Sequence, residues 1–131
     1  MSIGDIMLSR FHLLRRRLLA LTLAALTPTA ASAHAMLHSS DPADAATLPS
    51  SPRALNLAFS EECRVTALRL LDESGREHQV RREGGRAASA RATATVAAPL
   101  PSGAYRLEWR AMGDDGHVMS GTVKFAVAAA R

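Results

Sequence analysis

The sequence contains one cysteine, Cys63, and therefore no pair that could form a disulfide within the chain. A lone cysteine could be a metal ligand, an intermolecular link or a small core residue. We favour the core role, because free cysteine packs well among apolar side chains. The chain also lacks the common catalytic motifs: it has no G-x-S-x-G, no H-E-x-x-H, no glycine-rich phosphate loop and no C-x-x-C. We therefore expect neither a disulfide scaffold nor an enzyme.

Aromatic residues are scarce as well, at 4% of the chain, and they do not alternate with the basic residues. Surfaces that bind single-stranded nucleic acid combine basic side chains with stacking aromatics. Here the arginines are spread along predicted strands and turns, and we interpret them as a solvated face: Arg64, Arg69, Arg76, Arg81, Arg82, Arg86 and Arg91. The sequence therefore predicts no nucleic-acid partner.

The first 33 residues have the three parts of a secretory signal peptide. Arg10 and residues 15–17 form a basic region, residues 18–26 (LLALTLAAL) are apolar but too short to span a membrane, and residues 31–33 (Ala-Ser-Ala) form a cleavage site. We expect cleavage after Ala33, which leaves residues 34–131 as one exported domain; an uncut anchor is the alternative. Four of the 16 basic residues and one of the 12 acidic ones precede the cut, so the mature net charge is +1.

The mature region has the period-two alternation of half-buried strands. Leu55, Leu57 and Phe59 alternate with smaller or polar residues, and the same pattern recurs around Trp109 and Phe125. Strands are predicted at 34–38, 54–59, 65–71, 77–82, 87–98, 105–109 and 123–127. The connections are a proline-bearing stretch at 39–52, turns at 73–75, 84–85 and 99–103, and a loop at 112–121. About seven short strands predict an all-β antiparallel sandwich.

The loop before the last strand contains the one cluster that could carry chemistry, residues 114–117 (Asp-Asp-Gly-His). Residues two apart in an extended segment project to the same side, so Asp115 and His117 can point at one ion. A carboxylate and an imidazole are two of the ligands that a borderline divalent metal takes. Taken alone, D-x-H also fits a capping aspartate beside an exposed histidine.

The cleavage site makes the metal hypothesis stronger. Cutting after Ala33 makes His34 the first residue, and its free α-amine and imidazole can then chelate a metal together. With Asp115 and His117, this gives a nitrogen and oxygen donor set that suits Cu(II) among the divalent metals. The sequence therefore predicts a Cu(II) site formed by His34, Asp115 and His117.

The chain also resembles the CopC family of periplasmic copper-resistance proteins, and the similarity runs in order along the mature chain. The family's amino-terminal H-A-x-L-x-x-S-x-P-A is matched by residues 34–43 (HAMLHSSDPA), and its L-x-F-S-E by residues 57–61. Its G-x-Y-x-x-x-W strand is matched by Gly103, Tyr105 and Trp109, and its D-G-H-x-x-x-G-x-x-x-F by residues 115–125. The resemblance implies a seven-stranded Greek-key barrel, immunoglobulin-like or cupredoxin-like. It also implies Cu(II) ligation by His34, Asp115 and His117.

The sequence departs from the family pattern in two places. Some members hold Cu(I) in a methionine-rich loop, but Met36, Met112 and Met119 form no M-x-x-M cluster, so we interpret them as core or loop residues and do not expect the family's methionine-rich Cu(I) site. Gly113 replaces the usual serine, which is expected to loosen the loop without removing a ligand. His38 and His78 match no family ligand and are expected at the surface; on a strand, His38 could face the same side as His34.

The leading hypothesis is a non-catalytic, monomeric periplasmic protein that carries or buffers copper, for copper tolerance or for delivery to an inner-membrane importer. A second hypothesis is an enzyme, because an amino-terminal histidine and a second histidine also form the histidine brace of lytic polysaccharide monooxygenases. Those enzymes use a flat, often aromatic substrate surface, whereas the few aromatics here alternate as core residues. A structural immunoglobulin-like adhesion module is the third hypothesis. We favour copper binding.

Overall fold

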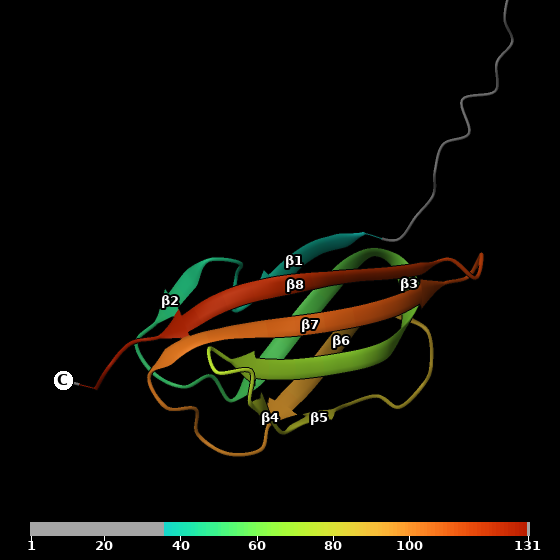
Figure 1. Cartoon of the computed structure of the whole chain (residues 1–131). Helices are drawn as coiled ribbons and strands as arrows, with labels where there is room; N and C mark the ends of the chain where they lie inside the picture. The colour runs from blue at the N-terminus through green and yellow to red at the C-terminus, as the bar shows by residue number, and fades with distance from the viewer. Residues whose placement is uncertain (1–35, 131) are drawn as a thin grey trace, which may run out of the picture. The chain divides into compact units, whose positions relative to one another are not determined.

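The computed structural model describes residues 36–130, and the regular structure in this part of the chain is all β (Figure 1). The strands are β1 (Leu37–Asp41), β2 (Ala46–Leu48), β3 (Ala54–Asp72), β4 (Glu77–His78), β5 (Val80–Arg82), β6 (Ser89–Val96), β7 (Gly103–Gly113) and β8 (Val118–Val127). No helix in residues 36–130 is long and apolar enough to cross a membrane.

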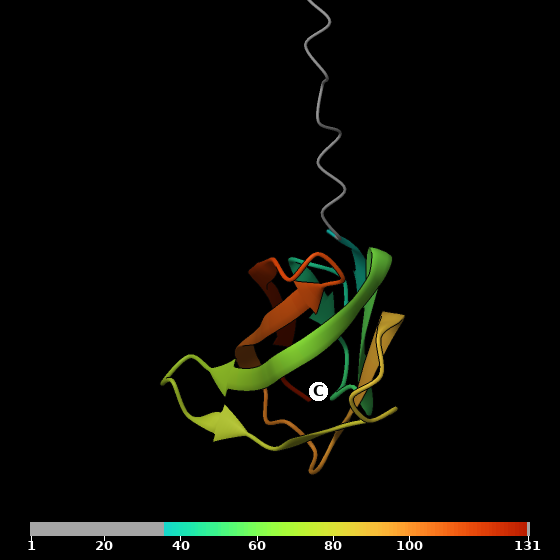
Figure 2. The same ribbon diagram turned by 90° about the vertical axis from the view of Figure 1, so that its right-hand side faces the viewer.

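The long strand β3 organises the fold because its two halves pair with different neighbours. Its first half pairs with β1 and β6, and its second half pairs with β7 and β4. The register with β6 shifts between Ala58 and Cys63, where the strand passes from one layer to the other. Figure 2 shows β3 curving around the side of the sandwich. The remaining order, β7 to β8 to β2 on one side and β6 to β5 on the other, completes a half-barrel.

The core lies between these layers and follows the predicted alternation. Leu55, Leu57 and Phe59 are buried along the first half of β3. Alternate residues of β7 and β8 face them, among them Tyr105, Leu107, Trp109, Val123, Phe125 and Val127. The Tyr105 hydroxyl donates to the Pro101 carbonyl at 2.6 Å, so its polar end is satisfied. The expectation that the mature aromatic residues belong to the core is confirmed.

The all-β sandwich is as predicted, but the strand count and pairing differ. The described residues form eight strands instead of seven, and β2 runs parallel to β8, from Ala46↔Phe125 to Leu48↔Val127. Residues 39–52, expected to be a connection, contribute the end of β1 and all of β2. These short strands are held by backbone pairing at sheet edges, which needs no apolar alternation. The predicted strands 54–59 and 65–71 are one continuous strand.

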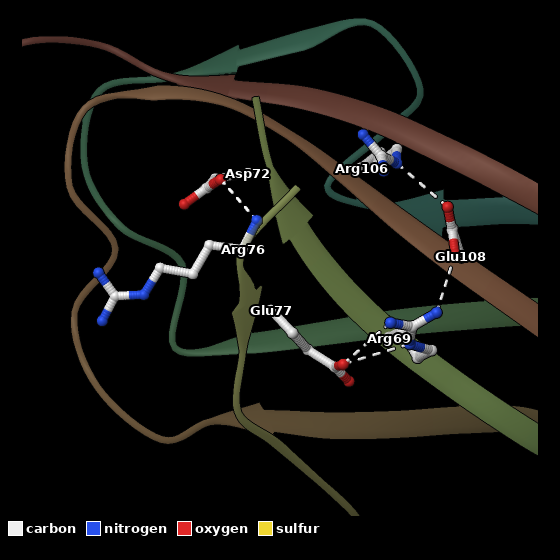
Figure 3. A network of polar contacts seen from close by, with 6 residues as sticks. All are labelled: Arg69, Asp72, Arg76, Glu77, Arg106 and Glu108. Carbon is white, nitrogen blue, oxygen red and sulfur yellow. Dashed lines mark hydrogen bonds and ion pairs between the residues drawn. The ribbon is translucent and has the colours of Figure 1, made fainter. Parts of the chain in front are cut away.

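The outer face of β3, β4 and β7 carries a network of ion pairs (Figure 3). Arg69 contacts Glu77 at 3.1 Å and Glu108 at 3.8 Å, and Arg106 contacts Glu108 at 3.1 Å. Arg69 is about half exposed, as the solvated-face interpretation requires. Arg82 departs from that interpretation, because it is partly buried and donates to the carbonyls of Val65 and Gly85.

Candidate metal centre

The β7–β8 hairpin positions the predicted pair of donors at its tip. Both strands extend further than expected, so the predicted loop 112–121 shortens to residues 114–117. Gly113 N–H donates to the His117 carbonyl, and Gly116 N–H donates to the Gly113 carbonyl, both at 3.0 Å. Gly116 has φ of 81°, a left-handed conformation that glycine adopts without strain. The glycine between the two donors is therefore what closes this tight turn.

Within the turn, Asp115 and His117 are in direct contact. His117 Nδ1 lies 2.7 Å from Asp115 Oδ2, and His117 N–H donates to Asp115 Oδ1 at 3.0 Å. Two donors bound at right angles to one ion, each about 2.0–2.1 Å away, lie about 2.9 Å apart. The observed separation is therefore close to that of two neighbouring ligands. The Asp115 and His117 side chains are 43% and 69% exposed, so an ion can reach them from solvent.

Gly113 leaves room for this arrangement. A β-carbon added at Gly113 would lie 3.0 Å from Asp115 Oδ1, tighter than ordinary van der Waals contact. The turn itself is closed by two backbone hydrogen bonds. The glycine instead gives the Asp115 carboxylate space beside the end of β7.

The start of β1 is fastened at the same end of the sandwich. Met36 N–H donates to Ser60 Oγ at 2.9 Å, and Ser60 N–H donates to the Met36 carbonyl at 2.8 Å. Three residues after Ser60, Cys63 pairs with Gly113 at the base of the hairpin turn. The predicted ligand His34 lies outside the described residues. The strand-end motif that contains Ser60 does not by itself indicate this contact with Met36.

Exposed acidic residues occur on both strands at this end. Glu61 and Glu62 are exposed on β3 just before Cys63, whose partner Gly113 precedes Asp114 and Asp115. A local excess of carboxylates raises the concentration of cations near the surface. Among residues 36–130, no three histidine, cysteine or acidic side chains form a group that could hold a metal ion by themselves.

The other candidate residues are accounted for separately. Cys63 is 2% exposed, and burial raises the pKa of its thiol, so the predicted core role is confirmed. His38 is exposed, as expected. His78 is less exposed than expected: its side chain is 18% exposed, its Nε2 lies 2.9 Å from Asp72 Oδ2, and its ring packs edge-on against Tyr105. No sequence pattern around His78 indicates this contact with Asp72.

By its fold and its site, the chain is a small all-β sandwich protein. It carries an exposed carboxylate–imidazole pair at the tip of one hairpin. Residues 37–128 match the CopC domain family model, and the chain belongs to that family. The copper resistance protein C of Xanthomonas campestris pv. juglandis is 33% identical over 112 residues, covering 79% of this chain and 87% of its own.

Solved structures show the same fold. The crystal structure of CopC from Methylosinus trichosporium OB3b superposes with a TM-score of 0.67 at 22% identity, covering 75% of this chain and 97% of that one. PcoC, a methionine-rich copper resistance protein from Escherichia coli, gives 0.60 at 28% identity, covering 72% and 99%. The predicted family membership is therefore confirmed over nearly the full length of these relatives.

Proposed function

We propose that this protein binds one Cu(II) ion as cargo after export to the periplasm, and that it serves copper resistance without catalysing a reaction. The observation that carries the proposal is the contact of 2.7 Å between His117 and Asp115 at the exposed hairpin tip. Membership of a family that includes copper resistance proteins supports copper as the metal.

The proposed ligands are His34, Asp115 and His117. Cleavage after Ala33 would free the α-amine of His34, which would then bind the ion together with its own imidazole. A set of amine, imidazole and carboxylate donors favours Cu(II), because nitrogen and oxygen ligands in a tetragonal arrangement match its preferred geometry. The hydrogen bonds between Met36 and Ser60 support this model, because they fasten the chain two residues after His34.

Carriage is favoured over catalysis by the position of the aromatic residues. Phe59, Tyr105, Trp109 and Phe125 are each at most 7% exposed, so they offer no flat aromatic face to a polysaccharide. A carboxylate ligand at the ion would also occupy a position that oxygen needs in a histidine-brace enzyme. We further propose that the protein acts as a monomer and passes copper to an inner-membrane transport protein.

The test is a set of melting curves with and without one equivalent of Cu(II). A ligand that binds only the native state stabilises it by RT ln(1 + [L]/Kd), so the wild type should gain stability with copper. His117→Ala should lose nearly all of this gain, and Asp115→Asn should lose less, because the amide keeps the shape and removes only the anionic oxygen. Without copper, both variants should stay within about 0.5 kcal/mol of the wild type, since the turn is exposed.

His78→Ala is the control for histidine loss in general. It should lower stability through its contacts with Asp72 and Tyr105, yet keep the full copper-induced gain. If wild type and His117→Ala show the same copper-induced gain, the Asp115–His117 pair is structural and the proposed ligation is wrong.

A further inference from the structure

A pocket of about 470 Å³ opens beside the Asp115–His117 pair. It is formed by the start of β1, the middle of β7 and the start of β8, and it is lined by Met36, Leu37, Trp109, His117, Val118 and Met119, together with Ser120. Met36 and Met119 are 83 positions apart in the sequence, so no short methionine motif could have indicated that they meet. The fold thus gathers two thioethers and an imidazole around one cavity.

The two methionines differ in their exposure. Met36 is 68% exposed, although two hydrogen bonds to Ser60 fix its backbone. Met119 is half-buried and packs against the core, opposite Ala111 in the β7–β8 register. One thioether is therefore open to solvent at the rim and the other is held in the wall. Met112 does not line this pocket and pairs with Val118 instead.

The floor of the pocket is rigid and apolar. Trp109 is 7% exposed, and Phe59 meets its ring edge-on at a centroid distance of 5.3 Å. A β-carbon at Gly121 would lie 2.6 Å from the Trp109 ring, so only a glycine at this position leaves room for the ring. An indole ring attracts cations, and an apolar wall offers no oxygen donors to a strongly hydrated ion. The pocket therefore suits a weakly hydrated cation.

We propose that this pocket is a binding site for Cu(I), with the sulfurs of Met36 and Met119 and the imidazole of His117 as ligands. Thioether sulfur is a soft donor and selects Cu(I) over Cu(II), whereas nitrogen and oxygen donors select Cu(II). The site shares His117 with the proposed Cu(II) centre but needs neither His34 nor Asp115. The two ions therefore compete for His117 and do not bind at the same time.

The test uses Ag(I), a redox-inert mimic of Cu(I), and Cu(I) itself in anaerobic competition with a chromophoric chelator. Changing a partner that only orients a ligand costs about 10- to 100-fold in metal affinity, so losing a direct ligand should cost at least about tenfold. Met36→Leu and Met119→Leu should each weaken Ag(I) and Cu(I) binding by that factor, and His117→Ala should do the same. Met112→Leu, the matched control, should bind as the wild type does. In the wild type labelled at the methionine methyl groups, Ag(I) should shift the NMR signals of Met36 and Met119 and leave Met112 unmoved.

One further variant separates this site from the proposed Cu(II) centre. A chain that keeps Ala33 in front of His34 has no α-amine on His34, so it should lose tight Cu(II) binding and keep Ag(I) binding. Equal Ag(I) affinity in the wild type, Met36→Leu and Met119→Leu would overturn the Cu(I) site, whatever Cu(II) does. A shift of the Met112 signal that matches those of Met36 and Met119 would also overturn it, because binding would then be nonspecific.

Discussion

Ser60 is placed to affect the proposed Cu(II) site without being one of its ligands. Its Oγ accepts the Met36 N–H at 2.9 Å, two residues after the proposed ligand His34. Its own N–H donates to the Met36 carbonyl, and this second bond belongs to the backbone, so substitution leaves it in place. We propose that Ser60 is a positioning residue, whose hydroxyl holds Met36 two residues after the proposed ligand His34.

We predict that Ser60→Ala weakens Cu(II) binding by about tenfold, as does loss of other groups that only orient a ligand. The free energy of unfolding should fall by only about 1 kcal/mol, the net contribution of an ordinary hydrogen bond. Isothermal titration with Cu(II) and chemical denaturation measure the two effects separately.

Ser51→Ala is the matched control for Ser60→Ala. Ser51 Oγ accepts the Leu100 N–H at 2.8 Å, the same kind of bond in a different part of the fold. It should lower stability by a similar amount and leave Cu(II) affinity unchanged. If both variants lose copper affinity equally, the effect comes from stability and Ser60 has no positioning role.

At the scale of the element, the turn from β3 to β4 is held by one carboxylate. Asp72 accepts hydrogen bonds from Ser74 Oγ at 2.6 Å, Ser74 N–H at 2.9 Å and Arg76 N–H at 3.1 Å, and it contacts His78 Nε2 at 2.9 Å. The hydrogen bonds from Ser74, then that with His78, hold the pKa of Asp72 well below its usual value. These hydrogen bonds reach full strength only when the Asp72 carboxylate is charged, so the turn depends on the ionisation of Asp72.

The direction of the pH effect follows from the lowered pKa. An unfolded aspartate has a pKa of about 3.9, so the stabilisation by Asp72 is fully present above that pH and declines as the pH falls below it. We predict that the unfolding free energy of the wild type drops between about pH 4 and pH 2 more steeply than that of Asp72→Asn. Urea denaturation at a series of pH values measures both slopes. Parallel curves would show that the Asp72 bonds add no net stability.

The elements also show which parts of the fold the sequence can specify. Residues 105–109 of β7 and 123–127 of β8 were predictable because every second side chain there is buried, and the hydrophobic pattern records burial directly. β2 was missed because its pairing with β8 uses only backbone groups, which every residue carries. The continuity of β3 through Ser60 and Glu62 was missed for a related reason, since these exposed residues sit where the strand changes layers.

At the scale of the whole molecule, the candidate centre combines parts that differ in how far sequence can reveal them. Asp115 and His117 are two residues apart, so their contact was predictable from local geometry. The role of Ser60 and the meeting of Met36 with Met119 depend on which strands lie side by side, and that is fixed by the global packing of the sandwich. Local spacing therefore indicated the two candidate donors, Asp115 and His117. The residues around them could be identified only from the folded structure.

The last prediction concerns how export and copper binding depend on each other. The α-amine of His34 exists only after cleavage following Ala33, so the precursor and the mature protein should differ sharply in Cu(II) affinity. An α-amine has a reference pKa of about 8 and an imidazole about 6.5, and Cu(II) must displace protons from both. Binding by the mature protein should therefore weaken steeply below about pH 6. Mass spectrometry of the exported protein should find His34 as its first residue, and a copper titration across this pH range should show the loss. A first residue at Ala35 or later, or a copper spectrum unchanged down to about pH 4, would contradict ligation by the His34 amine and imidazole.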